Sequence, residues 1–294
     1  MKVLAYGATG SQLRSLVPQL LERGHEVKVL SRNAARSSSL PAAAEIVRGD
    51  VTDPGSLLAA SRGADVVAFM LPAFLEHPEQ KLDYAASAAS AAASAGVKLI
   101  VWNTSGRYPF PQESRHSDKL LRALHERVAA AGVPLIVMAP TTYVENLLGP
   151  WTVNAIRAGR VAYPVLENRK MGWIASRDLC ALMTAAIERP HLAGQVFRVS
   201  GVEAVTGPEL AAIFAEVLKR PLSYQTLTPQ QMKQALEVAF GPGSGAGVAN
   251  EYALDQADTN PRINHYDMSD VLQVLPAKMT RLREWISEHQ DQFA

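Results

Sequence analysis

The chain has 294 residues, of which 48% are hydrophobic and 19% charged, with a formal net charge of +1. This composition predicts a folded globular protein, and the near-neutral charge without a Lys/Arg-rich run gives no basis for nucleic-acid contact. The single cysteine, Cys180, excludes an internal disulfide and a cysteine-based metal cluster, so we expect no metal site and a buried, inert thiol. No apolar run reaches the roughly 18 residues of a membrane helix, and strand-like residues begin at Met1, so we expect a cytoplasmic protein without a membrane segment.

Short apolar segments alternate with helical patterns through the first half of the chain. The predicted strands cover 3–6, 26–30, 45–48, 66–71, 99–102 and 135–138. The predicted helices cover about 12–23, 55–62, 81–95 and 117–131. This alternation predicts an α/β fold with a doubly wound parallel sheet and helices on both faces.

The pattern changes near residue 145. Predicted helices in the second half cover 151–158, 178–188, 210–218, 229–240 and about 277–289, and extended segments cover 160–164 and 195–200. Thr206 and Glu209 have the spacing of a capping box. The glycine-rich segment 240–247 is either a mobile flap over a site or a plain surface loop.

The turn after the first strand carries the clearest functional signal. Its predicted cofactor-binding residues are Gly7, Thr9, Gly10, Ser11 and Gln12. A strand, a glycine turn and a helix start form the phosphate cradle of a dinucleotide-binding Rossmann-type unit. We therefore expect an NAD(P)-binding domain over 1–145, followed by a second, smaller α/β region over 146–294. Within the latter, about 174–201 is expected to return to the first sheet.

The motif lacks its third glycine, which is replaced by Leu13. That glycine permits close packing between helix and strand. Leu13 must therefore turn into the core or push the first helix outward, and weakened cofactor binding is one expected result. Arg14, the next residue, offers a compensating phosphate contact.

The end of the second strand bears on the choice between the two nicotinamide cofactors. An acidic residue there would bind the ribose 2′-hydroxyl of NAD(H). The chain instead has Ser31, Arg32, Asn33 and Arg36. Arginine pairs with phosphate at two points, so Arg32 favours NADP(H) over NAD(H), although an exposed loop arginine is the alternative.

The remaining predicted cofactor contacts follow other strands of the sheet. They are Asp50, Val51, Leu71, Pro72, Thr104, Ser105 and Pro140. Ligands bind off the carboxyl ends of parallel strands, so these positions should gather at one edge. Asp50 is expected beside the adenine, whereas Asp53 caps the next helix.

Several segments, taken together, match a known family. They are 7–12, 49–53, Ala139-Pro140-Thr141-Thr142-Tyr143-Val144-Glu145-Asn146-Leu147, 177–179 and the helix start at 205–210. These segments resemble the NmrA-like branch of the atypical short-chain dehydrogenase/reductases. The resemblance implies a Rossmann domain, NADP(H) binding and a small, mostly C-terminal substrate domain. It does not imply one activity, because the family includes quinone and imine reductases and NADP-sensing regulators that catalyse nothing.

The usual catalytic pair of short-chain dehydrogenases is absent, because no tyrosine has a lysine four positions later. The substitutes that we expect are Lys119, which resembles the helix lysine of the reductase members, His116 as a proton donor, and Tyr143 near the nicotinamide. The alternative interpretation of Lys119 and His116 is that they are ordinary surface residues. Lys119 and Tyr143 are also predicted cofactor contacts.

These observations predict an NAD(P)H-dependent oxidoreductase that transfers hydride to a small conjugated or aromatic acceptor, such as a quinone, imine or enone. Such acceptors need no strong acid, since orientation of the two rings supplies much of the rate. The alternative is a non-catalytic NADP(H)-binding redox sensor, and an isomerase or lyase is a weaker third hypothesis. A homodimer is one expectation for the oligomeric state.

Overall fold

The computed structural model describes residues 1–294 except 34–38, 73–74, 76 and 260–261, so the predicted contact of Arg36 lies outside the described residues. The chain folds into two compact units. The first comprises Met1–Pro140, Ser176–Val199 and Ser269–Lys278. The second comprises Thr141–Ala175, Ser200–Met268 and Met279–Ala294.

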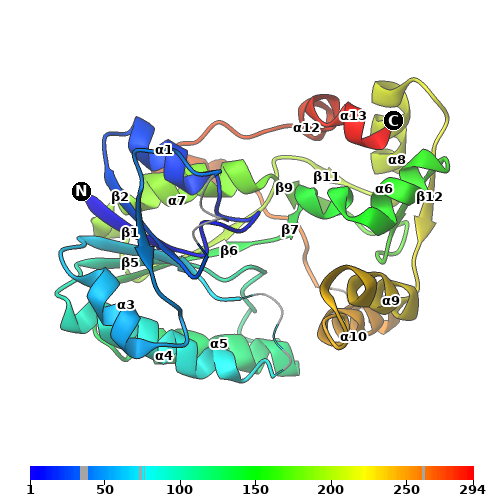
Figure 1. The fold of residues 1–294 in the computed structure, drawn as a ribbon. Helices are drawn as coiled ribbons and strands as arrows, with labels where there is room; N and C mark the ends of the chain where they lie inside the picture. The colour runs from blue at the N-terminus through cyan, green and yellow to red at the C-terminus, as the bar shows by residue number, and fades with distance from the viewer. Residues whose placement is uncertain (34–38, 73–74, 76, 260–261) are drawn as a thin grey trace. The chain divides into compact units, whose positions relative to one another are not determined.

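A seven-stranded parallel sheet forms the centre of the first unit (Figure 1). The strands are β1 (Lys2–Tyr6), β2 (Glu26–Ser31), β3 (Glu45–Arg48), β4 (Val66–Met70), β5 (Leu99–Asn103), β6 (Leu135–Pro140) and β10 (Val196–Val199). Their order is β10-β6-β5-β4-β1-β2-β3, so the chain reverses direction across the sheet between β1 and β4. This doubly wound order confirms the predicted fold class and places the ligand-binding crevice of such sheets beside β1.

Helices cover both faces of this sheet (Figure 1). One face carries α3 (Pro54–Ser61), α4 (Gln80–Ser94) and α5 (His116–Ala129), and the other carries α1 (Leu16–Glu22) and α7 (Ser176–Ile187). The unit also contains η2 (Pro190–Leu192) and α11 (Ser269–Val274). α4 is rich in alanine, the best helix former, and its buried alanines pack in the core with Phe69 and Trp102.

The first helix begins four residues later than its sequence pattern predicts. Residues 11–15 form a turn in which the Arg14 N–H donates to the Gly10 carbonyl at 3.0 Å. Leu13 is fully buried, so it turns into the core, the first of the two outcomes expected for it. The predicted start at residue 12 was wrong because the turn that buries Leu13 comes before α1. Ser11 and Gln12 therefore lie in the turn, and not on the helix.

Contacts with α7 hold α1 in place. The Gln19 side chain donates to the Arg177 carbonyl at 3.0 Å, and Arg23 forms an ion pair with Glu188 at 2.6 Å. Hydrogen bonds from Arg23 and, to a smaller extent, His25 hold the pKa of Glu188 below its usual value. Cys180 on α7 is fully buried, as expected, and its thiol lies 3.5 Å from the Gln12 carbonyl.

The second unit contains two small sheets. β9 (Met171–Ile174) pairs with β7 (Thr142–Tyr143) and β11 (Ala204–Val205), and β8 (Arg160–Tyr163) pairs with β12 (Ser223–Thr226). The helical elements are η1 (Val144–Leu148), α6 (Pro150–Arg157), α8 (Gly207–Leu218), α9 (Pro229–Phe240), α10 (Ala246–Ala257), α12 (Leu282–Glu288) and α13 (Gln290–Phe293). Its core includes the aromatic side chains of Tyr163, Trp173, Phe214, Trp285 and Phe293.

Two helix starts in this unit show what sequence can and cannot predict. The predicted capping box is confirmed, since the Thr206 N–H donates to Glu209 at 2.7 Å and the Glu209 N–H donates back at 3.4 Å. The last helical pattern was predicted over 277–289, but α12 begins only at Leu282. There the Leu282 N–H donates to the Glu203 carboxylate at 2.8 Å, a contact between segments 79 residues apart.

Candidate functional site

The loops that follow β1, β2, β4 and β5 leave the first unit's sheet at one edge, because these strands are parallel neighbours. The structure thereby brings together most of the predicted cofactor contacts. They are the turn residues 7–12, Arg32, Leu71, Pro72, Thr104 and Ser105, with Asp50 and Val51 following β3 and Pro140 ending β6. This edge is the candidate cofactor site.

The turn after β1 needs glycine at its first position. Gly7 has a φ of 77°, a left-handed backbone conformation that other residues rarely adopt. A Cβ at Gly7 would lie 3.3 Å from the Met70 carbonyl oxygen of β4. The Gly10 N–H donates to the Gly7 carbonyl at 3.0 Å and closes the turn. The backbone here therefore forms a tight turn held close against the end of β4.

The side-chain oxygen of Gln12 bears on whether a dinucleotide fits this site. Its side-chain oxygen Oε1 is buried and has no hydrogen-bond partner among the described residues. A buried acceptor without a donor costs free energy, so such an atom suits a site where a ligand provides the donor. Gln12 together with the Gly7 turn thus fits a bound nicotinamide dinucleotide, whose ribose and amide groups carry donors. Thr9 is half-buried in the same turn, and Ser11 is exposed.

Arg32 pairs with Asp50 at this edge. Arg32 Nη1 lies 3.8 Å from Asp50 Oδ2, and the Arg32 side chain is 70% exposed. Asp50 also accepts from the Thr52 N–H at 2.9 Å, while Asp53 caps α3 as predicted by accepting from the Gly55 N–H. A 2′-phosphate at Arg32 would have to compete with the Asp50 carboxylate.

The end of β5 is held by short-range hydrogen bonds. The Thr104 hydroxyl donates to the Met138 carbonyl at 3.2 Å and also contacts the Gly106 carbonyl. Ser105 has a φ of 60°, and its N–H donates to the buried Asn103 side chain at 2.8 Å. Because the Thr104 proton is directed at carbonyl oxygens of the protein, its hydroxyl is left to accept from a ligand.

The predicted catalytic residues lie in different environments. His116 and Lys119 are exposed on the first turn of α5, where His116 Nε2 lies 3.6 Å from Glu79 Oε1. Tyr143 is buried on β7 and belongs to the second unit. Its neighbour in the family segment, Asn146, donates to the Tyr163 hydroxyl at 3.2 Å. The catalytic roles of His116, Lys119 and Tyr143 stay predictions.

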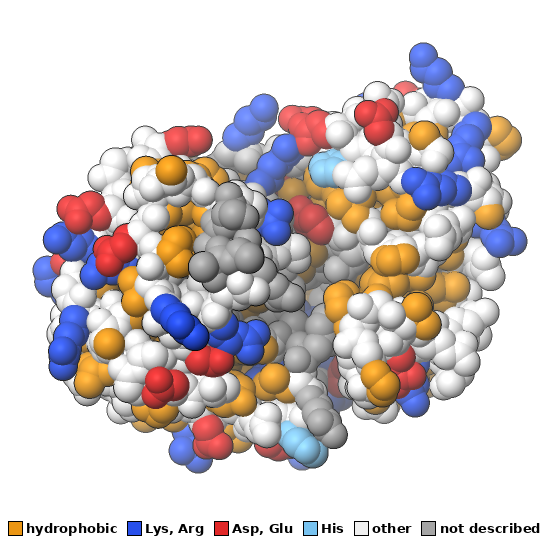
Figure 2. All heavy atoms as spheres, viewed as in Figure 1, with side chains coloured by type: hydrophobic (Ala, Val, Ile, Leu, Met, Phe, Trp, Pro, Cys, Tyr) orange, Lys and Arg blue, Asp and Glu red, His pale blue; other side chains and the backbone are white. Residues whose placement is uncertain are grey.

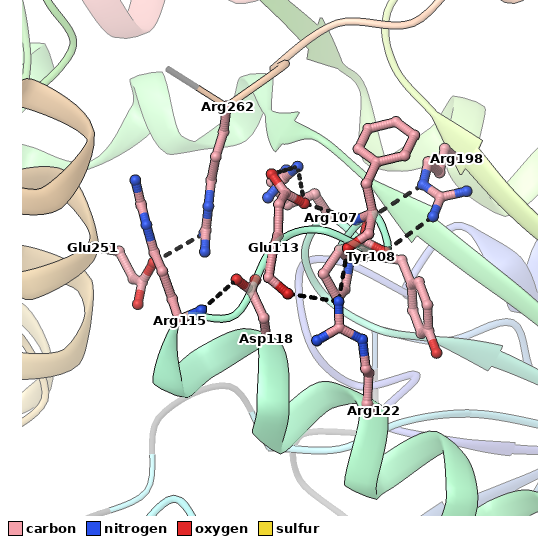
Figure 3. Close-up of polar contacts among 11 residues, drawn as sticks. Arg107, Tyr108, Glu113, Arg115, Asp118, Arg122, Arg198, Glu251 and Arg262 are labelled. Atoms are coloured by element: carbon pink, nitrogen blue, oxygen red, sulfur yellow. Dashed lines mark hydrogen bonds and ion pairs between the residues drawn. The ribbon is translucent and has the colours of Figure 1, made fainter. Parts of the chain in front are cut away.

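Arginines that the sequence analysis did not single out hold the β5–α5 loop, residues 104–115 (Figure 3). Arg107 Nη2 donates to both Glu113 carboxylate oxygens, at 2.7 and 2.8 Å. These two side chains are only 13% and 16% exposed. Arg122 donates to the Phe110 and Glu113 carbonyls, each at 2.7 Å.

A third arginine, Arg198, contacts the same loop from β10 (Figure 3). Its guanidinium carbon lies 4.4 Å from the centroid of the Phe110 ring, and its side chain donates to the Pro109 carbonyl at 3.0 Å. Arginines 107, 122 and 198 come from three separate segments and share no periodicity. Sequence patterns therefore gave no signal that they act together.

Two kinds of feature are absent from the described residues. Within them, no group of three or more His, Cys, Asp or Glu side chains is arranged to hold a metal ion. No helix in that part of the chain is both long and apolar enough to cross a bilayer. Among the coloured side chains on the face in Figure 2, positive and negative groups are interspersed.

Comparisons with known proteins give the chain's relationships. The NmrA-like family model matches residues 1–286. An NAD(P)H azoreductase of Xenophilus azovorans is 32% identical over 258 residues, 87% of this chain and 88% of the relative. A (4-alkanoyl-5-oxo-2,5-dihydrofuran-3-yl)methyl phosphate reductase of Streptomyces griseus is 28% identical over 293 residues, 99% of each chain.

A solved structure shows the same fold. The triphenylmethane reductase of Citrobacter sp. complexed with NADP(H) has a TM-score of 0.80 and 19% identity, and the match covers 98% of this chain and 99% of that one. The family match spans both units, including the turn at Gly7 and the segment that carries Tyr143. The chain therefore belongs to the NmrA-like family.

Proposed function

We propose that this protein is an NAD(P)H-dependent reductase that transfers hydride to a small conjugated or aromatic acceptor. The observation that carries the proposal is the turn at Gly7, whose left-handed backbone approaches the Met70 carbonyl so closely that a side chain would crowd it. The two relatives named above are both reductases, and the match to each covers most of the chain. Their acceptors, an azo compound and a conjugated furanone, motivate the proposed acceptor class.

The cofactor proposed is NADP(H) in preference to NAD(H). Arg32 follows β2, where an acidic side chain would favour NAD(H), and its guanidinium is suited to a 2′-phosphate. The pairing of Arg32 with Asp50 at 3.8 Å is long and exposed, so it is weak and easily exchanged for a phosphate. We therefore propose a modest preference for NADP(H).

The residues of the first unit have distinct proposed roles. The Gly7–Gln12 turn binds the pyrophosphate, and the Thr104 hydroxyl accepts from a ligand donor at the end of β5. The bound nicotinamide supplies the hydride. Lys119 or His116, both exposed on α5, delivers the proton that the reduced acceptor takes up. Because azo, quinone and enone acceptors are electron-poor, orientation outweighs acid strength, consistent with the absence of the Tyr-x-x-x-Lys pair.

The test is NADPH consumption by the full chain with a panel of quinones, azo compounds, imines and enones, run beside a titration of NADPH binding. The expected result is binding together with turnover of at least one acceptor class. Of Lys119→Met and His116→Asn, the variant that removes the proton donor should lower kcat while leaving NADPH binding within a few-fold. Tight NADPH binding without turnover on any acceptor would contradict the reductase proposal and favour the redox sensor.

A further inference from the structure

A cavity of about 300 Å³ lies within the second unit. It is formed by the segment that links β8 to β9, by α10 and by residues 262–265. Small-molecule sites in proteins begin at about this size. None of its lining residues was singled out from the sequence, because three separate segments contribute them.

The cavity has apolar walls. Val165 and Ile263 line it, together with Tyr252. The Tyr252 hydroxyl donates to the Tyr163 hydroxyl at 3.1 Å, so the side chain is fixed in place. Burial raises the pKa of Tyr252 well above its usual value, and the phenol therefore stays uncharged. These walls suit the apolar part of a ligand.

Two adjacent cations, Arg169 and Lys170, also line the cavity. Arg169 Nη2 donates to the Asp258 main-chain carbonyl at 3.2 Å, an uncharged partner. The buried Nε of the same guanidinium has no hydrogen-bond partner among the described residues. Arg169 thus retains donor capacity that a second acceptor can use.

The other charged groups in and near the lining balance part of its positive charge. Arg262 is only 9% exposed and is paired with Glu251 at 3.0 Å, so its charge is balanced (Figure 3). Asp255 provides one carboxylate in the lining, and Lys170 also lies near Glu209, whose pKa it helps to lower after the hydrogen bonds from Thr206. Arg169, which keeps an unused donor among the described residues, therefore lies beside apolar walls.

We propose that this cavity binds an apolar small molecule that carries one anionic group, a carboxylate or a phosphate monoester, which Arg169 and Lys170 hold. A charged acceptor pairs with a guanidinium more strongly than a neutral one does, so the site selects anions over neutral molecules of the same shape. The proposal concerns binding alone and does not depend on hydride transfer.

The experiment is calorimetric titration of the full chain, without cofactor, with 1-naphthyl phosphate, 1-naphthoate and the neutral 1-naphthol. Both anions are expected to bind at least tenfold more tightly than 1-naphthol. Tighter binding of the phosphate than of the carboxylate assigns the site to phosphate esters, and equal binding assigns it to organic anions in general. Equal binding of all three compounds would overturn the proposal.

Arg169→Met should remove the anion preference, and Lys170→Met should reduce it about threefold. Arg160→Met is the matched control, because Arg160 is an exposed arginine of the same unit outside the cavity lining. Lys170 is exposed, so its variant keeps the test decisive if Arg169→Met fails to fold. An anion preference that survives both substitutions would place the anions elsewhere, such as at the Gly7 turn, and would overturn the proposal.

Discussion

The turn after β1 and the β5–α5 loop both leave the sheet of the first unit at its carboxyl edge, but they are stabilised in opposite ways. The β1 turn is closed by backbone contacts around Gly7 and leaves the buried Gln12 oxygen without a partner among the described residues. The β5–α5 loop is held by arginine side chains from three segments, since Arg107, Arg122 and Arg198 donate to its carboxylate and carbonyl groups. The first leaves a buried acceptor unused, and the second uses its polar groups in contacts within the protein.

The largest expected effect concerns the β5–α5 loop. Glu113→Gln removes the charge that balances Arg107 in a pair where both side chains are mostly buried. An unbalanced buried charge typically costs about 3 kcal/mol, so the free energy of unfolding in urea should fall by about that amount. NADPH binding at 25 °C should change little, because the hydrogen bonds that hold the β1 turn, Thr104 and Ser105 do not involve Glu113.

The control for Glu113→Gln is Glu216→Gln. Glu216 forms an ion pair with Arg283, but these side chains are 62% and 52% exposed. Exposed pairs contribute little, and this variant should show no measurable loss of stability. Equal losses in the two variants would show that the Arg107 pair is no more important than a surface pair.

The next effect concerns the β1 turn. Gly7→Ala places a Cβ 3.3 Å from the Met70 carbonyl oxygen at a φ of 77°, so the turn must shift. NADPH binding, measured by fluorescence titration, should weaken at least tenfold. Gly24→Ala is the matched control, because Gly24 also has a φ of 77° but no atom within 4 Å of the added Cβ. Both variants carry the backbone strain of roughly 1 kcal/mol, and only Gly7→Ala should lose cofactor binding.

A smaller effect is expected at Tyr6, the last residue of β1. Its hydroxyl lies 3.0 Å from the Ser61 hydroxyl, and burial raises the pKa of Tyr6 to about 12. Tyr6→Phe should lower stability by about 1 kcal/mol at pH 8 through the lost hydrogen bond.

The pH dependence of this variant follows from the raised pKa. The unfolded tyrosine ionises near pH 10 and the folded one only near pH 12. Wild-type stability is therefore intact below pH 10 and falls as the pH rises from 10 to 12. Phenylalanine does not ionise, and a two-unit rise in pKa corresponds to about 2.7 kcal/mol, so the deficit of Tyr6→Phe should narrow and then reverse across this interval in urea titrations. Parallel curves for the two proteins would contradict the assignment.

The smallest effect is expected at Arg32. Its side chain is 70% exposed and already lies near Asp50, so a phosphate contact there is screened by water. Arg32→Ala should weaken NADPH binding about threefold and leave NADH binding unchanged. The exposed Arg62, at the C-terminal end of α3, provides the control variant Arg62→Ala. An equal change in the affinities for NADPH and NADH would show that Arg32 does not contact the 2′-phosphate.

Local signals predicted the strands of the first unit and the Gly7 turn because the information lies within a few consecutive residues. The alternating apolar segments gave β3 at Glu45–Arg48 with its observed bounds, and the Thr206 capping box marked the start of α8. Both features depend on neighbours in the sequence. They were therefore predictable without knowledge of the fold.

Features that depend on distant contacts were missed. α12 begins at Leu282 because Glu203 accepts from its N–H, and no pattern near residue 282 indicates this. The start of α1 was misplaced because Leu13 is buried in the turn before it. The arginines of the β5–α5 loop and the cavity with Arg169 likewise join segments that only the folded chain brings together.

The packing of α1 against α7 has a consequence for protein synthesis. The Gln19 side chain donates to the Arg177 carbonyl and Arg23 pairs with Glu188, so the segment that follows the Gly7 turn depends on residues made more than 150 positions later. A nascent chain that ends near residue 145 contains the whole glycine motif but lacks α7 and β10. We therefore expect that the ribosome must translate past residue 199 before the turn after β1 acquires its final support.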